Sequence, residues 1–196
     1  MEKEIQQFFD FANQYVPLKM EDVIDLIPFI ELLEYDKKET VLGQGDKCKG
    51  LYFVIDGLFR LYQLPDATDR SCGFMGENEF YVDFESLILN KECTFFIETI
   101  EPTRMFFIPY DKLLLAYNCS HMLERFGRVM TERALVMLLK QTTVISKLKS
   151  EEKYANFEKE NKILASRIPL KHLASYIGIT PESLSRIRKA RVKSVS

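Results

Sequence analysis

The stretch IGITPESLSRIRKAR, residues 177–191, predicts the end of one helix, a short turn and the start of a second helix. Gly178 is expected to stop the first helix with a left-handed backbone. Thr180 can cap the free amides of the second helix, and Pro181 suits its first turn. The apolar residues expected to pack the two helices together are Leu170, Leu173, Ala174, Ile177, Leu184 and Ile187. This arrangement is a helix-turn-helix pattern.

Positive charge gathers at the same end of the chain. Residues 161–196 carry eight basic residues and one acid, Glu182, for a net charge of +7. The rest of the chain carries nineteen basic and twenty-eight acidic residues, a net charge of −9. A basic module on an acidic body favours contact with a polyanion. The alternatives are a solvated tail and a purely structural helical hairpin.

The second helix of the pattern exposes side chains that can reach base edges or phosphates. They are Glu182, Ser183, Ser185, Arg186 and Lys189. Because an acid and an arginine lie four residues apart on a basic helix, the pattern favours a recognition helix that enters the major groove of DNA.

Length and composition are those of a soluble globular protein. The 196 residues are 46% hydrophobic and 29% charged. The longest apolar runs fall far below the ~18 residues that span a bilayer, and MEKEIQQFFD does not resemble a signal peptide, so we expect a cytoplasmic protein with no membrane partner. The four cysteines form no CxxC pair and the chain has two histidines, so no cofactor and no metal site are predicted.

Two patterns divide the region before residue 110. Residues 4–34 show helical spacing interrupted by prolines, which predicts short helices. Residues 40–109 contain short aromatic or β-branched runs between turn signals, typical of a compact β-sandwich or roll. Asp56-Gly57, between LYFVI and LFRLYQL, indicates a tight hairpin.

A long helix is expected after Ser120, which can cap it, as far as Lys147 or Lys149. Its segment ALVMLL, residues 134–139, is apolar on all sides, so two faces must be covered. We expect the roll to cover one face and a second copy of the chain the other; the alternative is burial inside one larger core. The expected dimer contacts are Phe126, Met130, Ala134, Met137, Leu138 and Gln141. A further helix is predicted to begin with Ser150 as its cap.

Together these residues resemble the Crp/Fnr family of bacterial transcriptional regulators over nearly the whole chain. VLGQGDKCKGLYFVIDGLFRLY is similar to the family's sensor roll, with Gly45, Tyr52 and Gly57 at the expected spacing. The resemblance implies an α+β fold. Its parts are a cyclic-nucleotide-binding-like β-roll (a double-stranded β-helix) with flanking helices over residues 1–119, a dimerisation helix over 120–149 and a helix-turn-helix domain over 150–196. The family's two-stranded wing would be shortened or absent, since only RVKSVS follows Ala190.

The most specific likeness is LASYIGITPESLSRIRK, because the family's recognition helix typically reads E-[ST]-x-[SG]-R. Glu182, Ser183, Ser185 and Arg186 fall on those positions. The resemblance implies that the glutamate and arginine read a G·C pair, which suits their hydrogen-bonding groups. The full predicted DNA-binding set is Thr180, Glu182, Ser183, Ser185, Arg186, Lys189 and Arg191, and Lys193 would join Lys189 and Arg191 in contacting phosphates.

The sensor segment departs from the members that bind cyclic AMP. Those members hold the ribose and phosphate with Gly-Glu and, about ten residues later, Arg-Ser. Here YVDFESLILNKECTFF places Val82-Asp83 and Cys93-Thr94 at these positions, so a cyclic phosphate would meet acids and no arginine. The predicted effector-pocket residues are Asp83, Glu85, Cys93, Thr94, Met137 and Leu138.

We therefore expect a dimeric, sequence-specific DNA-binding regulator that does not respond to cyclic AMP. The alternative is a sensor or protein-interaction module that does not bind DNA. An enzyme on a cupin-like roll is not expected, since neither histidine falls in the strand region. The expected partners are an inverted-repeat DNA duplex, a second copy of the chain, RNA polymerase and an unidentified small-molecule effector.

Overall fold

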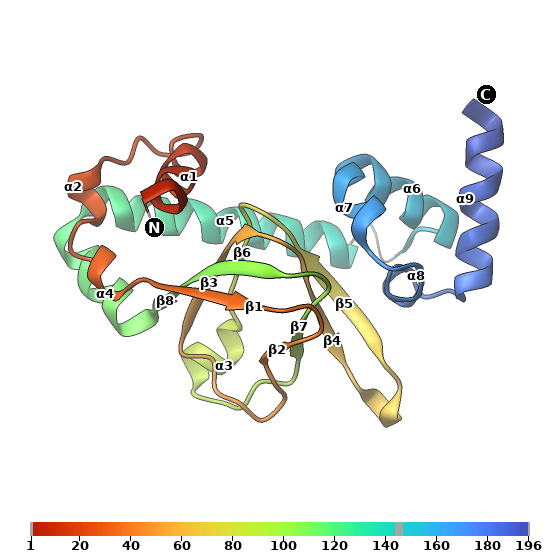
Figure 1. The fold of residues 1–196 in the computed structure, drawn as a ribbon, viewed down its shortest axis with the longest axis horizontal. Helices are drawn as coiled ribbons and strands as arrows, with labels where there is room; N and C mark the ends of the chain where they lie inside the picture. Colours follow the sequence, from red (N-terminus) through yellow and green to blue (C-terminus); the bar gives the residue numbers. More distant parts are fainter. Residues whose placement is uncertain (1, 144–146, 196) are drawn as a thin grey trace.

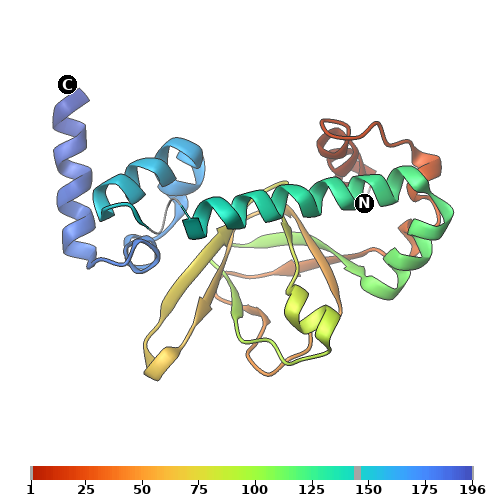
Figure 2. The same ribbon diagram turned by 180° about the vertical axis from the view of Figure 1, so that it is seen from behind.

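The computed structural model describes residues 2–143 and 147–195. A β-roll occupies the middle of the molecule, with N-terminal helices at one end and C-terminal helices at the other (Figure 1). Helix α5 (His121–Thr143) runs along the roll and connects the two ends (Figure 2). No helix in the described ranges combines the length and the apolar character that a membrane crossing needs.

The roll consists of two four-stranded antiparallel sheets, ordered β1-β8-β3-β6 and β2-β7-β4-β5. A short helix, α3 (Phe84–Leu89), follows β6. The strands are β1 (Glu31–Tyr35), β2 (Thr40–Leu42), β3 (Gly50–Asp56), β4 (Phe59–Gln63), β5 (Arg70–Met75), β6 (Phe80–Tyr81), β7 (Phe96–Thr99) and β8 (Thr103–Pro109). The predicted mixed fold with a β-roll is confirmed.

The turn at Asp56-Gly57 is not the predicted hairpin. Strands β3 and β4 belong to different sheets, so the chain crosses from one sheet to the other at this point. Gly57 has φ of +104°, and an added Cβ would lie 2.5 Å from the carbonyl oxygen of Pro102. Position 57 therefore needs glycine, because the crossing turn packs against the start of β8. The same Asp-Gly dipeptide also suits a hairpin, so the sequence alone does not separate the two turns.

The N-terminal region is helical only in part. Helix α1 (Glu2–Ala12), helix α2 (Met20–Val23) and the 3₁₀ turn η1 (Ile27–Phe29) match the expectation of short helices. Residues 31–34, the end of the range predicted to be helical, belong to strand β1 instead, which pairs antiparallel with β8. Pairing with a buried neighbouring strand overrides the local pattern in this five-residue stretch.

Helix α4 (Tyr110–Cys119) leads into α5, and Ser120 caps α5 as predicted. Its Oγ accepts a hydrogen bond from the amide of Leu123 at 3.1 Å. The predicted extension to Lys147 or Lys149 is wrong at its end, because Lys149 is extended and precedes the next helix. Residues 144–146, which belong to the predicted long helix, lie outside the described residues.

The C-terminal helices are α6 (Ser150–Glu160), α7 (Lys162–Arg167), α8 (Leu170–Ile177) and α9 (Pro181–Val195). Ser150 is the first residue of α6 and not its cap; the Glu152 carboxylate accepts a hydrogen bond from the Lys149 amide. Gly178 ends α8 with φ of +84°, as the sequence predicted. Helix α9 continues beyond Arg191 and includes most of RVKSVS.

The apolar core consists of several clusters, one inside the roll and others where helices pack on it. Side chains from both sheets fill the interior of the roll, among them Tyr52, Val54, Phe59, Tyr81 and Met105. The N-terminal helices pack on the β3–β8 sheet and the start of α5. A further cluster joins the C-terminal helices to the roll. The C-terminal module is thereby held against the roll of its own chain.

Candidate DNA-reading helix and effector site

Helix α9 is fixed at its start by the turn that precedes it. The Thr180 hydroxyl accepts a hydrogen bond from the Ser183 amide at 3.2 Å, which caps the helix. Leu184 is completely buried against α8, and Ile187 packs against the same cluster. Because residues three and four apart share one face, these contacts decide which side of α9 faces outward.

The outward side carries Glu182, Arg186 and Lys189, all exposed. Arg186 donates to the Ser183 hydroxyl at 3.1 Å, and Ser185 is half-buried at the edge of this face. Hydrogen bonds from its own amide and from Thr180, together with the nearby Arg186, lower the pKa of Glu182 below its ordinary value. The glutamate is therefore held as a charged acceptor beside an arginine donor, the pair needed to read both members of a G·C pair.

Arg191, predicted to contact phosphates, is partly engaged within the chain. It forms an ion pair with Glu158 of α6 at 3.2 Å and lies over the Tyr154 ring. Arg188, one turn earlier, donates to the Tyr154 hydroxyl and to the backbone carbonyl of Ala165. These two arginines join α9 to α6 and α7. The side chain of Lys193 lies outside the described residues.

The four sensor residues predicted near a cyclic phosphate lie in or beside α3. The Asp83 carboxylate caps this helix by accepting from the Ser86 amide at 3.0 Å. Glu85 pairs with Lys91 at 3.0 Å on the exposed surface, and Thr94 is also exposed. Cys93 is buried, and burial raises the pKa of its thiol, so it stays protonated near neutral pH. None of these groups supplies positive charge.

Two of the three arginines that could have replaced the missing one are engaged elsewhere. Arg60 is buried and paired with Asp69 and Glu98. Arg104 of β8 pairs with Glu4 of α1 and with Glu34 of β1. Arg70 is exposed at the start of β5. Arg60 and Arg104 are therefore not free to neutralise a phosphate beside α3.

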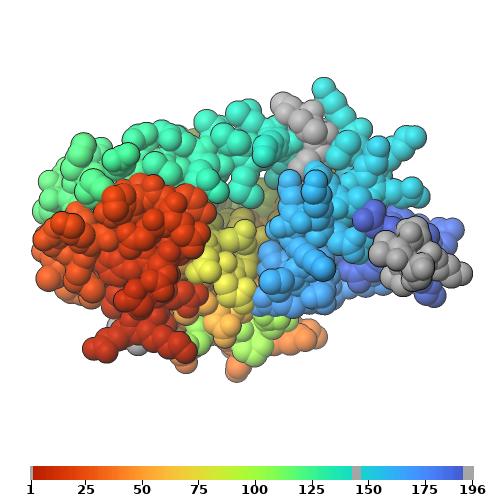
Figure 3. Space-filling view, turned by 90° about the horizontal axis from the view of Figure 1, so that it is seen from above, coloured from red at the N-terminus to blue at the C-terminus, as the bar shows by residue number. Residues whose placement is uncertain are grey.

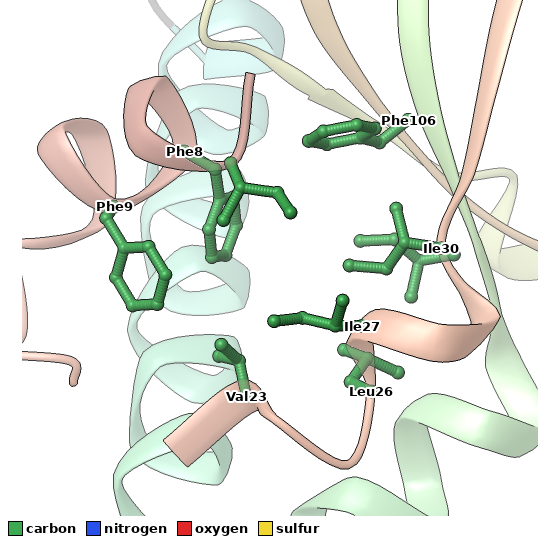
Figure 4. Close-up of a pocket in the computed structure, with 9 residues that line it drawn as sticks. Phe8, Phe9, Val23, Leu26, Ile27, Ile30 and Phe106 are labelled. Atoms are coloured by element: carbon green, nitrogen blue, oxygen red, sulfur yellow. The ribbon is translucent and has the colours of Figure 1, made fainter. Parts of the chain in front are cut away.

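One enclosed apolar space beside the roll is small. An apolar cavity of about 20 Å³ lies between the N-terminal helices and β8, lined by residues such as Phe8, Ile27 and Phe106 (Figure 4). This volume holds about one water molecule and no effector. Met137 and Leu138, predicted to close an effector pocket, are instead exposed on α5.

The second half of α5 is uncovered by its own chain. Residues 131–142 are all exposed, and each of the five apolar side chains from Leu135 to Leu139 is more than half exposed. This half of the helix forms an edge of the molecule in the space-filling view (Figure 3). The expectation that the roll covers one face of this segment is wrong. Of the predicted contact residues, Phe126 is 3% exposed in the chain's own core and Met130 is half-buried, whereas Ala134, Met137, Leu138 and Gln141 are exposed.

Sequence reasoning missed the junction between the C-terminal module and the roll. Arg60 Nη1 of β4 lies 2.8 Å from His172 Nδ1 of α8, and Ser175 Oγ accepts from the Ser71 amide of β5 at 3.1 Å. The signal available in the sequence is Arg60 itself, a charged residue between Phe59 and Leu61 in an apolar strand. A charge in such a position is expected to be buried with partners.

Comparison with known proteins supports the fold described above. Residues 32–118 match the family model of the cyclic nucleotide-binding domain. No curated protein sequence matches the chain. Among solved structures, FixK2 from Bradyrhizobium japonicum is 19% identical with a TM-score of 0.72, covering 84% of this chain and 85% of that one.

Two further structures have the same fold. CLP from Xanthomonas campestris, a c-di-GMP-responsive global regulator, is 16% identical with a TM-score of 0.69, covering 90% of this chain and 93% of its own. CooA from Carboxydothermus hydrogenoformans is 12% identical with a TM-score of 0.69, covering 86% and 78%. At these identities the likeness establishes a shared fold.

Proposed function

From its cyclic nucleotide-binding domain at residues 32–118 and the Crp/Fnr fold of the chain, we propose that this protein is a dimeric, sequence-specific DNA-binding transcriptional regulator whose effector is not cyclic AMP. The resemblance to the Crp/Fnr family is confirmed at the level of the fold. DNA binding, dimerisation and the nature of the effector are the parts that the proposal adds.

The observation that carries the proposal is the outward face of α9. Glu182, Arg186 and Lys189 are exposed in one line along the helix, while Leu184 anchors the opposite side. This is the arrangement that a recognition helix needs, because its base-reading residues must enter the groove while the helix stays attached to its module. The basic excess of residues 161–196 adds attraction to the phosphate backbone.

Dimerisation is supported by the exposed half of α5. Five consecutive large apolar side chains in water are costly, and a second copy of the same helix can cover them symmetrically. Each subunit of such a dimer contributes one α9, so the expected target is an inverted repeat with half-sites about one helical turn, ~34 Å, apart.

The effector proposal rests on the charge around α3. Asp83 and Glu85 are acidic, and Cys93 offers a neutral thiol where a phosphate would need a cation. A cyclic phosphate placed there would lie beside two carboxylates, and the neighbouring cation, Lys91, is already paired with Glu85, which is unfavourable. An effector of this protein is therefore not an anionic cyclic nucleotide held at α3.

Selection of bound duplexes from a random pool tests the proposal directly. The expected product is an inverted repeat whose half-sites contain a G·C pair, with a TTG-like core by resemblance to family members with the Glu-x-x-Ser-Arg pattern. Affinity for the selected duplex should fall steeply with salt, as phosphate contacts require. If no duplex is enriched and binding does not depend on salt, the protein is an interaction module that does not read DNA.

A further inference from the structure

The C-terminal module docks on the roll through a mixed polar and aromatic junction. Ser175 of α8 bonds the edge of β5 in both directions: its hydroxyl accepts from the Ser71 amide at 3.1 Å and donates to the Asp69 carbonyl at 3.2 Å. One residue further, Tyr176 meets the Phe74 ring edge-on at a centroid distance of 5.5 Å. Thus α8, the first helix of the helix-turn-helix, lies against the arm formed by β4 and β5.

His172, one turn before Ser175, joins the same junction through Arg60. The Arg60 side chain is 4% exposed, and its Nη1 lies 2.8 Å from His172 Nδ1. A guanidinium has only donors, so His172 Nδ1 must accept this hydrogen bond. The docked junction therefore requires His172 in its neutral form, with its ring proton on Nε2.

Four charged groups face this imidazole. Arg60 lies on β4, Asp69 precedes β5, Glu98 lies on β7 and Lys171 is its neighbour on α8. Asp69 accepts two hydrogen bonds from Arg60, at 2.7 and 2.9 Å, and Glu98 accepts a third at 3.1 Å. Both carboxylates are thus already committed to Arg60. Burial and the Arg60 charge lower the pKa of His172 below its ordinary value, more than the carboxylates raise it.

We propose that His172 is a proton-sensitive latch between the two modules. When neutral, it accepts the Arg60 hydrogen bond and α8 stays docked on the β4–β5 arm. When protonated, it loses its acceptor and places a second positive charge against a buried arginine, so α8 is released from the arm. Release removes the polar contacts that hold α8 on the arm, so the helix-turn-helix stays attached to the roll through Arg167 of α7, and α9 gains freedom of orientation.

The direction of the pH response follows from linkage. Because docking disfavours the protonated histidine, docking is fully stable above the ordinary histidine pKa, about 6.5, and weakens as pH falls below it. A single linked proton changes the docking equilibrium by at most about tenfold per pH unit. The response lies on the mildly acidic side of neutrality.

Hydrogen exchange at the Ser71 amide measures docking, since this amide donates to α8. The Val54 amide, in the interior of the roll, donates to Glu79 and serves as the internal reference. With exchange corrected for its intrinsic pH dependence, protection of Ser71 should fall below pH 6.5 by up to about tenfold per unit, while Val54 stays protected.

Two matched variants assign the response. His172→Gln retains a side-chain oxygen that can accept from Arg60 but cannot titrate, so Ser71 protection should become independent of pH. His121→Gln changes the chain's other histidine, which is exposed on α5, and should retain the wild-type response. The latch is refuted if wild-type protection is flat, if His172→Gln keeps the response, or if Ser71 and Val54 lose protection together.

A second measurement tests the proposal even if His172→Gln does not fold. In His121→Gln, His172 gives the only histidine resonance, and it should titrate below the ordinary pKa. Titration at or above that value overturns the proposal. Neither readout uses DNA, so failure of the proposed DNA binding and failure of the latch are distinguishable.

Discussion

Arg167 and Glu77 form a two-bond ion pair across the boundary between the C-terminal module and the roll. Arg167 Nη1 and Nη2 donate to the two carboxylate oxygens of Glu77 at 2.8 and 2.7 Å. The same guanidinium also bonds Glu101, so one residue of α7 neutralises two acids on turns of the roll. Together with the Arg60 junction, this clamp fixes the module at two separate points.

Replacing Arg167 with methionine should lower the free energy of unfolding by about 1–3 kcal/mol, because two half-buried carboxylates lose their partner. Urea denaturation measures the change. Arg128→Met is the matched control: it breaks an exposed i,i+4 pair with Glu132 and should cost no more than about 0.5 kcal/mol. Equal losses in the two variants would show that the clamp contributes no more than a surface pair.

The same clamp predicts a dependence on pH. Burial acts to raise the pKa of Glu77, but hydrogen bonds from Arg167 and the Gly57 amide outweigh it, and the pKa lies below its ordinary value. The clamp therefore stabilises the fold above the ordinary glutamate pKa and loses this contribution as pH falls through it.

Glu77→Gln should accordingly be less stable than wild type at pH 7, and the difference should shrink towards pH 4 as Glu77 becomes protonated. Urea denaturation at both pH values measures it. A difference that is the same at both would mean that the charge of Glu77 is not what stabilises the junction.

The exposed half of α5 predicts the oligomeric state. Sedimentation at micromolar concentration should give twice the chain mass of 23.0 kDa. Leu138→Glu should dissociate or unfold the dimer, because an unpaired charge would be buried in the interface. Leu115→Glu, on α4, is the control, since the two leucines are 56% and 59% exposed in the single chain. A folded wild-type monomer, or equal effects of the two changes, contradicts this role for α5.

The outward face of α9 predicts two kinds of DNA contact. Arg186→Ala should cost roughly 1–3 kcal/mol per half-site and relax preference at the G·C position. Lys189→Ala should weaken all duplexes alike and flatten the salt dependence, because a phosphate contact carries no base information. Anisotropy with cognate and scrambled duplexes at two salt concentrations separates them. Arg186 would be a phosphate contact if its loss affected both duplexes equally.

Cyclic AMP and cyclic GMP should not bind appreciably. The acids Asp83 and Glu85 and the neutral thiol of Cys93 offer no counter-charge to a cyclic phosphate. Calorimetry at micromolar protein should show no saturable heat with either nucleotide. Micromolar binding of one of them would mean that a cation, an arginine or Lys91 released from Glu85, meets the phosphate at α3.

Local signals in the sequence predicted much of the fold. The predicted helix stop at Gly178 and the predicted caps at Thr180 and Ser120 are all present. Such features are predictable because turns and caps depend on a few adjacent residues. The strand runs were also found, since their composition suits a half-buried sheet. The long helix was recognised from its spacing, although its end was placed too late.

Features that depend on distant partners were not predictable in this way. Asp56-Gly57 satisfies the chemistry of a hairpin and of a crossing turn equally, and only the sheet order decides between them. The apolar stripe of α5 gave no means to separate Phe126, which the chain buries itself, from Met137, which it leaves exposed. Arg191 was assigned the same phosphate-binding role as Lys189 because both are basic. In the structure, the packing of Leu184 orients α9 so that Arg191 faces Glu158. The Arg60–His172 contact joins residues 112 positions apart.

The sheet order has a consequence for how the chain acquires its structure. Among the described strands, β4 and β5 are the only consecutive pair joined in one sheet; every other pairing links strands separated by at least two others. Local pairings close short loops and form fast, whereas distant ones wait for longer closures. The β4–β5 arm should therefore form early. Ser71 and Ser175 are 104 residues apart, so the arm should be complete during synthesis before α8 has been made. The C-terminal helices would then pack on a surface that is already folded.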